Sequence, residues 1–404
     1  MPTGFSLRDA VARRAVQKVN FLSRVISRGS GTVIGGRIGL AIAPELLSSL
    51  SSDRNIVLVS GTNGKTTTVA MIAGGWGGEV ATNDTGSNMP AGLVAALAAV
   101  SSPSVVLEVD ESWLEEVVRS TSPRVITLLN LSRDQLDRAN EVRRIAERWR
   151  SVVSTMSETV VVANANDPLV VYAAETAFDV AWCDVPTPWT TDAMSCPHCT
   201  RALHFSDESW WSDCGFAKPT VIATSLRDGL VVRGTPLVLN LALPGAFNEA
   251  NAAMALTALS YVGGDLAEAL QRVNALSSVA GRFSLRQWRE HRLRLLLAKN
   301  PAGFSAMLET IPHDGRDVWV AINARVADGH DPSWLYDVPF ELLQGHRVFC
   351  LGDRRLDLAT RLDYANVDFV MVHDESTLPV ATYPIPVLAN YTAFQEWRTR
   401  SNEC

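Results

Sequence analysis

The chain has 404 residues, of which 47% are hydrophobic and 20% are charged, and its formal net charge is −7. This length predicts two or three globular domains, and the acidic balance argues against general binding of nucleic acid by charge. No apolar run reaches the roughly 18 residues of a membrane-spanning helix and the N-terminus lacks a signal-peptide pattern, so we expect a cytoplasmic protein whose six cysteines are thiols or metal ligands.

The first 50 residues predict a helical N-terminal segment. Apolar and basic residues recur over 5–28 with the spacing of an amphipathic helix. Such a helix could lie on an anionic membrane surface. More often it packs on its own domain with its basic face in water, and we favour this second interpretation. A Gly/Ser-rich patch follows at 29–36, and a second helical piece is expected near 40–50.

The candidate for chemistry is the stretch 56–68. Its β-branched start predicts a buried strand at 56–60, which ends in a glycine turn and leads into a predicted helix at 66–74. In a strand–turn–helix of this kind, backbone N–H groups and the helix N-terminus bind phosphate oxygens. Lys65 would reach the β- and γ-phosphates of a nucleotide, and the Thr66 hydroxyl would ligate Mg²⁺.

This motif departs from the full phosphate-loop pattern at one position. Gly-x-x-Gly-Lys-Thr spans 61–66, whereas Val59 stands where the longer pattern has its first glycine. The alternative, an ordinary strand-to-helix turn, leaves the Gly-Lys-Thr sequence at the phosphate position unexplained. We therefore predict nucleotide binding.

Strands and helices alternate from residue 56 onward, which predicts a mostly parallel sheet covered on both faces. In such sheets ligands bind beyond the carboxyl ends of the strands, so polar residues at those ends are candidates. Helices are expected at 90–100 and 112–119, and further strands at 104–109, 124–129 and 159–163.

Carboxylates follow the strand 104–109. Glu108, Asp110 and Glu111 could hold Mg²⁺ directly or through water; the alternative is a solvated loop that caps the next helix. Polar residues also follow the next two strands, at 130–138 and 164–168.

Together these motifs resemble those of the Mur ligase superfamily of ATP-dependent amide-forming enzymes. Their order and spacing cover most of residues 55–285, and one departure is Gln135, where several members carry His. The matching pieces are Gly61-Thr-Asn-Gly64-Lys65-Thr66, Glu108 to Glu111, Asn130 with Asp134 to Asp137, Asn164 to Asp167, Gly245 to Ala253, and Gly281-Arg282-Phe283.

The resemblance implies roles for individual residues. Lys65 and Glu108 would act in catalysis, and Mg²⁺ would be held by Thr66, Glu108 and Glu111. Asn248 and Asn251 share a face of a predicted helix, for which capping or plain helix surface is the alternative. The residues implied to bind the nucleotide are Gly61, Thr62, Asn63, Gly64, Lys65, Thr66, Thr67, Asn248, Asn251 and Arg282.

Within the superfamily the chain is similar to the MurT family, the ligase-like subunits of lipid II isoglutaminyl synthase. The similarity lies in the loop 85–89, in a cysteine insert, and in the segments 299–304 and 327–334. It implies a heterodimer with a GatD-type glutaminase that releases ammonia from glutamine. It also implies that ATP activates the α-carboxylate of D-glutamate in lipid II as an acyl phosphate, which ammonia converts to D-isoglutamine in peptidoglycan synthesis. A lipid-linked substrate would be compatible with contact at the inner face of the membrane.

The cysteine insert, at about 182–216, interrupts the alternation of strands and helices. A Cys-x-x-Cys knuckle and a second arm that ends in Cys-Gly outline a zinc ribbon, with Ser212 where a fourth cysteine is expected. A lost or partial site is the alternative. The predicted ligands of a closed structural zinc are Cys183, Cys196, Cys199 and Cys214, with His198 and His204 as other candidates for the fourth position.

A second, smaller α/β domain is expected from about residue 286. The resemblance implies that one of its aspartates completes the Cys–His pair of the partner glutaminase, by orienting the histidine as in a catalytic triad. Asp328, Asp331 and Asp337 are the candidates, and loop capping is the alternative for at least two of them.

The predicted architecture is therefore α/β with three parts: a helical segment at 1–50, a Mur ligase-like ATP-binding domain at 51–285 that contains the insert, and a C-terminal α/β domain at 286–404. One alternative function is a conventional Mur or folylpolyglutamate-type amino-acid ligase, against which the insert and the short C-terminal domain speak. Another is a non-catalytic nucleotide-binding subunit, against which the intact Lys65, Thr66 and Glu108 speak.

Overall fold

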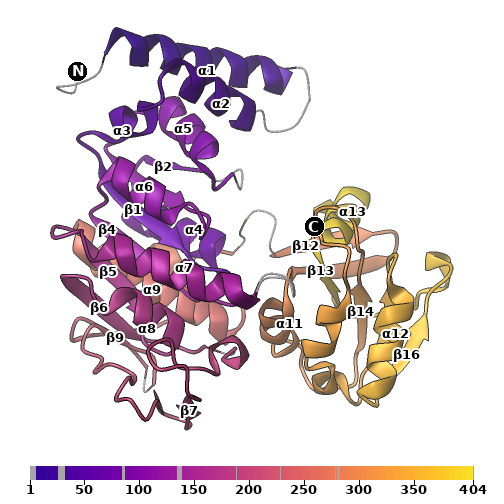
Figure 1. The fold of residues 1–404 in the computed structure, drawn as a ribbon. Helices are drawn as coiled ribbons and strands as arrows, with labels where there is room; N and C mark the ends of the chain where they lie inside the picture. The colour runs from indigo at the N-terminus through magenta and orange to yellow at the C-terminus, as the bar shows by residue number, and fades with distance from the viewer. Residues whose placement is uncertain are drawn as a thin grey trace. The chain divides into compact units, whose positions relative to one another are not determined.

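The structure is a computed structural model that describes residues 6–25, 32–83, 87–133, 139–187, 189–227, 229–277, 279 and 283–403. The chain forms two compact units (Figure 1). The first contains residues 1–131, 140–242 and 246–277, and the second contains 132–139, 243–245 and 278–404. None of the described helices has the length and apolar character needed to cross a membrane.

A nine-stranded sheet forms the centre of the first unit, in the order β11-β10-β9-β6-β5-β4-β1-β3-β2. The strands from β9 to β2 in this order pair in parallel, and β10 and β11 add an antiparallel edge, so the predicted mostly parallel sheet is confirmed. The strands are β1 (Asn55–Ser60), β2 (Val80–Thr82), β3 (Ser104–Glu108), β4 (Val125–Leu128), β5 (Val160–Asn164), β6 (Asp179–Asp184), β9 (Thr224–Ser225), β10 (Leu230–Val232) and β11 (Thr235–Leu237).

Helices cover both faces of this sheet (Figure 1). Ile56 and Leu58 of β1 belong to one buried cluster with side chains of α5 to α8, while α4, α9 and α10 pack together. Because both faces are covered, β1 is buried along nearly its whole length and reads as a continuous apolar run. The helices are α4 (Lys65–Trp76), α5 (Pro90–Ala99), α6 (Leu114–Thr121), α7 (Ala139–Val153), α8 (Pro168–Ala174), α9 (Ala246–Val262) and α10 (Leu266–Asn274).

The N-terminal segment packs into the first unit through α1 (Leu7–Val25), α2 (Thr32–Ile42) and α3 (Leu46–Ser51). Helix α2 begins inside the Gly/Ser-rich patch, where the sequence did not predict a helix. A Cβ on Gly35 would lie 2.0 Å from Asn20 Oδ1, and one on Gly36 would lie 1.7 Å from the carbonyl oxygen of Ala91. These glycines let α2 approach α1 and α5 closely, and that packing outweighs their low helix propensity.

The insert carries a small aromatic core of its own. Trp210 and Phe216 are buried beside Leu203 and Cys196, and they pack on Val171 of α8. Its regular elements are the 3₁₀ turn η2 (Thr191–Ala193) and the two-stranded sheet of β7 (His204–Phe205) and β8 (Trp210–Trp211).

A seven-stranded sheet of order β16-β15-β14-β17-β13-β12-β18 forms the second unit. The strands from β16 to β13 in this order are parallel, and β12 and β18 add an antiparallel edge. The predicted boundary at 285/286 falls inside β12. The elements are β12 (Phe283–Trp288), β13 (His291–Leu297), α11 (Pro301–Leu308), β14 (Asp317–Ala321), η3 (Ser333–Asp337), η4 (Phe340–Leu343), β15 (Arg347–Leu351), α12 (Arg355–Tyr364), β16 (Asp368–Met371), η5 (Glu375–Thr377), β17 (Ile385–Ala389), α13 (Tyr391–Arg400) and β18 (Asn402–Glu403).

Candidate functional site

The predicted phosphate loop lies at the carboxyl end of β1, between Ser60 and the first residue of α4, Lys65. Gly64 has a φ of 86°, and a Cβ there would lie 2.5 Å from Asn251 Oδ1. Any side chain at this position would therefore be strained in its backbone and would also collide with Asn251. The turn needs glycine for both reasons.

Lys65 is folded into this turn. Its Nζ donates to the carbonyl oxygens of Gly61 at 2.5 Å and Thr62 at 3.3 Å, and it forms an ion pair with Glu111 Oε2 at 3.1 Å. Burial raises the pKa of the Glu111 carboxyl, and the neighbouring Lys65 opposes that rise. Lys65, which the sequence predicts to bind phosphate, and Glu111, which it predicts to bind magnesium, thus contact each other in this structure.

The Thr66 hydroxyl donates to Glu108 Oε2 at 2.6 Å. Asn88 Nδ2 lies 3.4 Å from the other carboxylate oxygen, Glu108 Oε1. Asn83 holds the backbone of Glu108 through two hydrogen bonds of 2.8 Å. A hydroxyl and a carboxylate side by side are hard oxygen ligands of the kind that Mg²⁺ prefers, so the residues present fit the ion that the sequence predicts.

The strand β4 is tied to the loop by Asn130, which follows it. Asn130 Oδ1 accepts from the Asn63 N–H at 2.9 Å, and Asn130 Nδ2 donates to the Asn63 carbonyl at 3.0 Å. The Thr62 N–H donates to the backbone carbonyl of Asn130 at 3.0 Å. These bonds fix the loop between two neighbouring strands. The sequence motif continues through 134–138, which lies outside the described residues, as does Arg282.

One of the two predicted asparagines of α9, Asn251, lies at the loop. Asn248 and Asn251 are both buried, and Asn251 is the residue that Gly64 closely approaches. Since α9 packs on α4, the Asn251 amide lies at the start of the phosphate-loop helix. Thr67, the remaining predicted nucleotide residue, is buried on α4.

Asp167 holds the end of β5 to its neighbours. Its carboxylate accepts from the Leu131 N–H at 2.7 Å and from the first N–H groups of α8, Leu169 at 2.9 Å and Val170 at 3.2 Å. Burial raises the pKa of Asp167 to about 6 despite these three donors. This residue of the Asn164–Asp167 motif therefore acts as a helix cap and a loop clamp.

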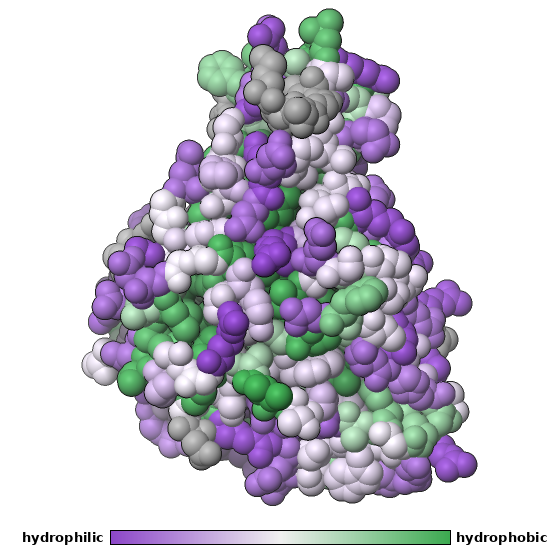
Figure 2. Space-filling model, turned by 90° about the vertical axis from the view of Figure 1, so that its left-hand side faces the viewer, coloured by the Kyte–Doolittle hydropathy of each residue, from purple (hydrophilic) through white to green (hydrophobic). Residues whose placement is uncertain are grey.

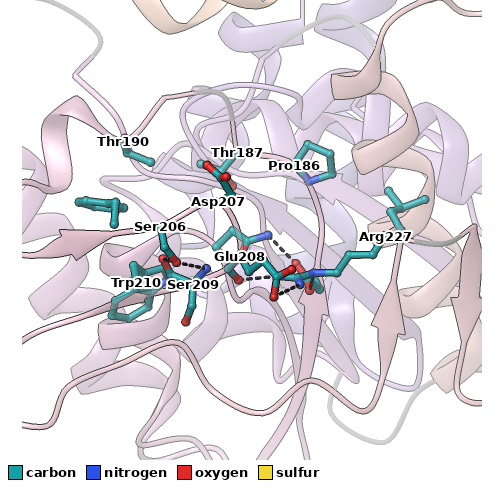
Figure 3. A pocket seen from close by; sticks show the side chains of 13 residues that line it. Pro186, Thr187, Thr190, Ser206, Asp207, Glu208, Ser209, Trp210 and Arg227 are labelled. Carbon is teal, nitrogen blue, oxygen red and sulfur yellow. Dashed lines mark hydrogen bonds and ion pairs between the residues drawn. The ribbon is translucent and has the colours of Figure 1, made fainter.

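A pocket of about 300 Å³ lies farther along the same sheet edge, where the ends of β5 and β6 meet the insert (Figure 3). The sequence did not predict it, because its residues come from segments with no common motif. Those that line it include Asn166, Asp184, Thr187, Thr190, Ser206, Trp210 and Arg227.

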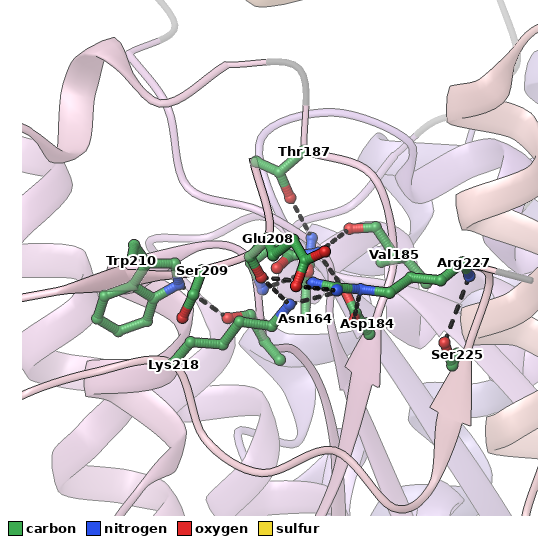
Figure 4. Close-up of polar contacts among 12 residues, drawn as sticks. Asn164, Asp184, Val185, Thr187, Glu208, Ser209, Trp210, Lys218, Ser225 and Arg227 are labelled. Atoms are coloured by element: carbon green, nitrogen blue, oxygen red, sulfur yellow. Dashed lines mark hydrogen bonds and ion pairs between the residues drawn. The ribbon is translucent and has the colours of Figure 1, made fainter. Parts of the chain in front are cut away.

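Asp184 is the centre of a polar network in the wall of this pocket (Figure 4). It accepts from Lys218 Nζ at 2.9 Å, Arg227 Nε at 2.7 Å and Asn166 Nδ2 at 2.7 Å. Burial alone would raise the pKa of Asp184, but the bonds from Lys218 and Asn166 hold it below its usual value. Both cations also donate to the carbonyl of Glu208, so the network fastens the insert to the sheet.

Three of the four predicted zinc ligands come together in the insert. The thiols of Cys196, Cys199 and Cys214 all lie within 4.8 Å of one another. Ser212 Oγ lies 3.4 Å from Cys199 Sγ and 3.6 Å from Cys214 Sγ, and its hydrogen bond lowers the pKa of Cys199 to about 7. Three close thiols and a hydroxyl are a donor set that fits Zn²⁺.

The prediction that Cys183 supplies the fourth ligand is wrong for this structure. Cys183 is a buried residue of β6, its Sγ lies 3.7 Å from Thr257 Oγ1, and burial raises its pKa to about 12. The two other candidates are engaged with carboxylates: His198 Nε2 lies 2.7 Å from Glu175 Oε1, and His204 Nε2 lies 3.2 Å from Asp213 Oδ1. The residue that faces the three thiols is Ser212.

The three candidate aspartates of the second unit differ in their surroundings. Asp328 accepts from the Thr392 N–H at 2.9 Å and from the Thr392 hydroxyl, which fixes its loop to α13. Asp337 forms an ion pair with Arg133, in which Asp337 Oδ2 lies 3.7 Å from Arg133 Nη2. Asp331 is exposed, and hydrogen bonds from Ser333 hold its pKa below the usual value, so it stays ionised.

Comparison with known families locates two domains in this chain. A model of the Mur ligase middle domain matches residues 59–186, and a model of the MurT ligase C-terminal domain matches residues 297–394. The lipid II isoglutaminyl synthase (glutamine-hydrolysing) subunit MurT of Streptococcus pneumoniae is 27% identical, over 93% of this chain and 93% of that protein. The subunit of the same name from Staphylococcus aureus is 27% identical, over 87% of this chain and 86% of that protein.

Solved structures agree on the fold. A pseudomurein peptide ligase type C from Methanothermus fervidus superposes with a TM-score of 0.67 at 18% identity, over 88% of this chain and 80% of that chain. A second match is UDP-N-acetylmuramoylalanyl-D-glutamyl-2,6-diaminopimelate–D-alanyl-D-alanyl ligase from Acinetobacter baumannii. It superposes with a TM-score of 0.60 at 12% identity, over 90% of this chain and 78% of that chain. With its Mur ligase middle domain, its MurT-type C-terminal domain and full-length relatives of that name, the chain belongs to the MurT family of Mur ligases.

Proposed function

We propose that this protein is the ATP-dependent synthase subunit of a glutamine-hydrolysing amidotransferase that converts D-glutamate of the lipid II stem peptide to D-isoglutamine. The observation that carries the proposal is the pairing of Lys65 with Glu111 and of Thr66 with Glu108 at the phosphate loop. The full-length relatives of the chain bear that activity in their names. Peptidoglycan synthesis would then be the process it serves.

ATP bound with Mg²⁺ would supply the phosphoryl group that turns an unreactive carboxylate into an acyl phosphate. The chain's own contribution is positioning and charge. The backbone N–H groups at the start of α4 and Lys65 would hold the phosphates. Thr66 and Glu108 would hold the ion with Glu111 nearby, and Asn248 and Asn251 would lie beside the nucleotide.

The ammonia would come from a partner. The names of the relatives describe a subunit of a glutamine-hydrolysing enzyme, which supports a heterodimer with a glutaminase of the GatD type. Of the three candidate aspartates, Asp331 suits a shared triad best, because it is exposed and ionised while Asp328 is committed to its own loop.

The insert would hold a structural zinc ion through Cys196, Cys199 and Cys214, with Ser212 at the fourth corner. The support is the distance of the three thiols from one another and the contacts of Ser212 with two of them. Zinc should copurify with the protein in the absence of chelators. The Ser212→Cys variant should bind zinc more tightly, and the Cys183→Ala variant should bind it as the wild type does. Protein without stoichiometric zinc, or zinc lost in Cys183→Ala, would contradict this ligand set.

The activity itself is tested by ATP hydrolysis and amide formation with lipid II and ammonium, in the presence and absence of a glutaminase partner. We expect ATP turnover that depends on both lipid II and an ammonia source. Turnover with a free amino acid in place of ammonia would favour a conventional Mur-type ligase. ATP binding without turnover in the assembled pair would favour a non-catalytic subunit.

A further inference from the structure

The outward face of α1 is a stripe of apolar residues with cations in its middle. Leu7, Val11, Phe21 and Leu22 are exposed by 85%, 52%, 64% and 55%. Arg14 and Lys18 are exposed in the same stripe. On an ideal helix these six positions fall within roughly a third of the circumference. Residues of the opposite face, such as Val16, are fully buried, so the stripe is a surface that the described part of the first unit leaves uncovered.

Helix α2 buries its small residues and exposes its large apolar ones, the reverse of the usual arrangement in a surface helix. It buries Gly35, Gly36 and Gly39 against its neighbours and exposes the branched side chains of Val33, Ile34 and Ile38 by 38%, 56% and 37%. A surface helix in water normally turns its large apolar residues toward the core. At the upper end of Figure 2, over the N-terminal helices, hydrophobic and hydrophilic residues stand side by side.

The charge of this region is opposite to that of the whole chain. Residues 7–42 contain seven Lys or Arg and a single acidic residue, Asp9, whereas the protein as a whole carries −7. Asp9 is buried and accepts hydrogen bonds from Ser6, so it does not neutralise the outer face. Within the described part of the chain, Arg14, Lys18 and Arg37 have no carboxylate partner.

We propose that the outward faces of α1 and α2 form a docking surface for an anionic lipid bilayer. The apolar side chains would enter the headgroup region, and the long cationic side chains would reach up to the lipid phosphates. A protein partner fits less well, because lysine is depleted at protein interfaces, and here Lys18 stands in the middle of the stripe.

The position of this surface suits a substrate anchored in lipid, and in this respect the inference rests on the proposed function. Gly36 of α2 lies against Ala91 near the start of α5, and the loop before α5 carries Asn88, which contacts Glu108. One helix therefore separates the docking surface from the candidate magnesium ligand. A protein held on the bilayer by this surface would keep its phosphate loop close to a lipid-linked peptide.

Cosedimentation of the full-length protein with vesicles of phosphatidylcholine, with and without phosphatidylglycerol, tests the proposal without ATP or substrate. We expect binding to the anionic vesicles that weakens with salt. Arg14→Gln with Lys18→Gln should weaken it by on the order of tenfold. Phe21→Ser with Ile34→Ser should do the same, while the matched control Ile222→Ser, at a site 85% exposed elsewhere in the first unit, should leave it unchanged. Hydrogen exchange should show protection at 7–42 when vesicles are added.

Absence of binding by the wild type, equal binding to both kinds of vesicle, or equal loss in the control would overturn the proposal. Protection of 7–42 by a glutaminase partner but not by vesicles would assign the surface to that partner and also overturn it. Vesicle binding by a protein that amidates no lipid-linked peptide would contradict the proposed function alone. Conversely, full amidation of a soluble stem peptide by the protein, without any vesicle binding, would contradict the docking surface alone.

Discussion

The phosphate-loop edge of the first unit and the aspartate loop of the second unit carry their candidate groups in opposite settings. Lys65, Glu108 and Glu111 are buried or nearly so, and each is already held by partners within the chain. Asp331 is exposed and contacts only Ser333 among the contacts described for it. This difference fits the proposed function, in which a small ligand would complete the first site and groups of a partner protein would complete the second.

The strongest test of this contrast is Asp331→Asn in the assembled pair. If Asp331 orients the glutaminase histidine, glutamine-driven amidation should fall by about 10³-fold, while amidation driven by added ammonium should be unchanged. The matched control is Asp328→Asn, which removes an acceptor from Thr392 and should cost about 1 to 2 kcal/mol of stability without a selective effect on glutamine use. Equal glutaminase rates in wild type and Asp331→Asn would remove Asp331 from the triad.

Lys65→Ala should show the converse pattern. Loss of the ammonium group should lower the rate of ATP-dependent amidation by about 10² to 10³-fold, because transition-state charge on the phosphates is no longer neutralised. Glutamine hydrolysis by the partner should continue. Lys218→Ala is a matched control, since Lys218 is another buried lysine paired with a carboxylate at the same sheet edge, away from the loop. A comparable loss of kcat in the control would mean that the effect is structural.

Glu108→Gln separates ion binding from phosphate binding. The amide keeps the shape and can still accept from Thr66, but it removes a negative charge, so the Mg²⁺ concentration for half-maximal activity should rise by about tenfold. Glu115→Gln serves as the control, because Glu115 is a carboxylate of α6 that pairs with Arg119 and is not a candidate magnesium ligand. An unchanged Mg²⁺ requirement in Glu108→Gln would assign the ion to other ligands.

The phosphate-loop edge could be predicted because its signals are local. Gly64, Lys65 and Thr66 are adjacent in sequence, and parallel strands bring Glu108 and Asn130 to the same edge by topology alone. Asn83 was missed, because the support it gives to the Glu108 backbone depends on a side-chain rotamer in a loop without a motif.

The cysteine group and α2 show where sequence reasoning fails. Cys183 matched the ligand type, but its place in β6 depends on strand pairing with Asn164 and Thr224, which spacing does not reveal. The glycines of α2 predicted an irregular segment, because propensity counts only their cost within a helix. Their benefit is close contact with Asn20 and Ala91, residues distant in sequence.

The smallest expected effect concerns the pH dependence of stability. The pKa values of Asp167 and Asp331 are shifted in opposite directions. Burial raises the pKa of Asp167 from 3.8 to about 6, whereas hydrogen bonds from Ser333 lower that of the exposed Asp331. For Asp167 the folded state binds the proton more tightly than the unfolded chain, so its contribution to stability is full below about pH 4 and is lost as the pH rises through about 6. For Asp331 the sign is reversed, and its contribution is lost as the pH falls.

Asp167→Asn should therefore remove a decline of up to about 3 kcal/mol in the free energy of unfolding between pH 4 and pH 7. The variant should be less stable overall at pH 4, because its amide cannot accept all three N–H groups of Leu131, Leu169 and Val170. Urea midpoints of the first unit across this pH range measure the slope. An identical slope in the variant would show that Asp167 does not titrate there, and that its three backbone donors outweigh its burial. In that case burial alone would not explain why the carboxyl groups at the phosphate-loop edge and in the exposed aspartate loop differ in pKa. The hydrogen-bond donors that the chain supplies to each carboxyl group would explain it.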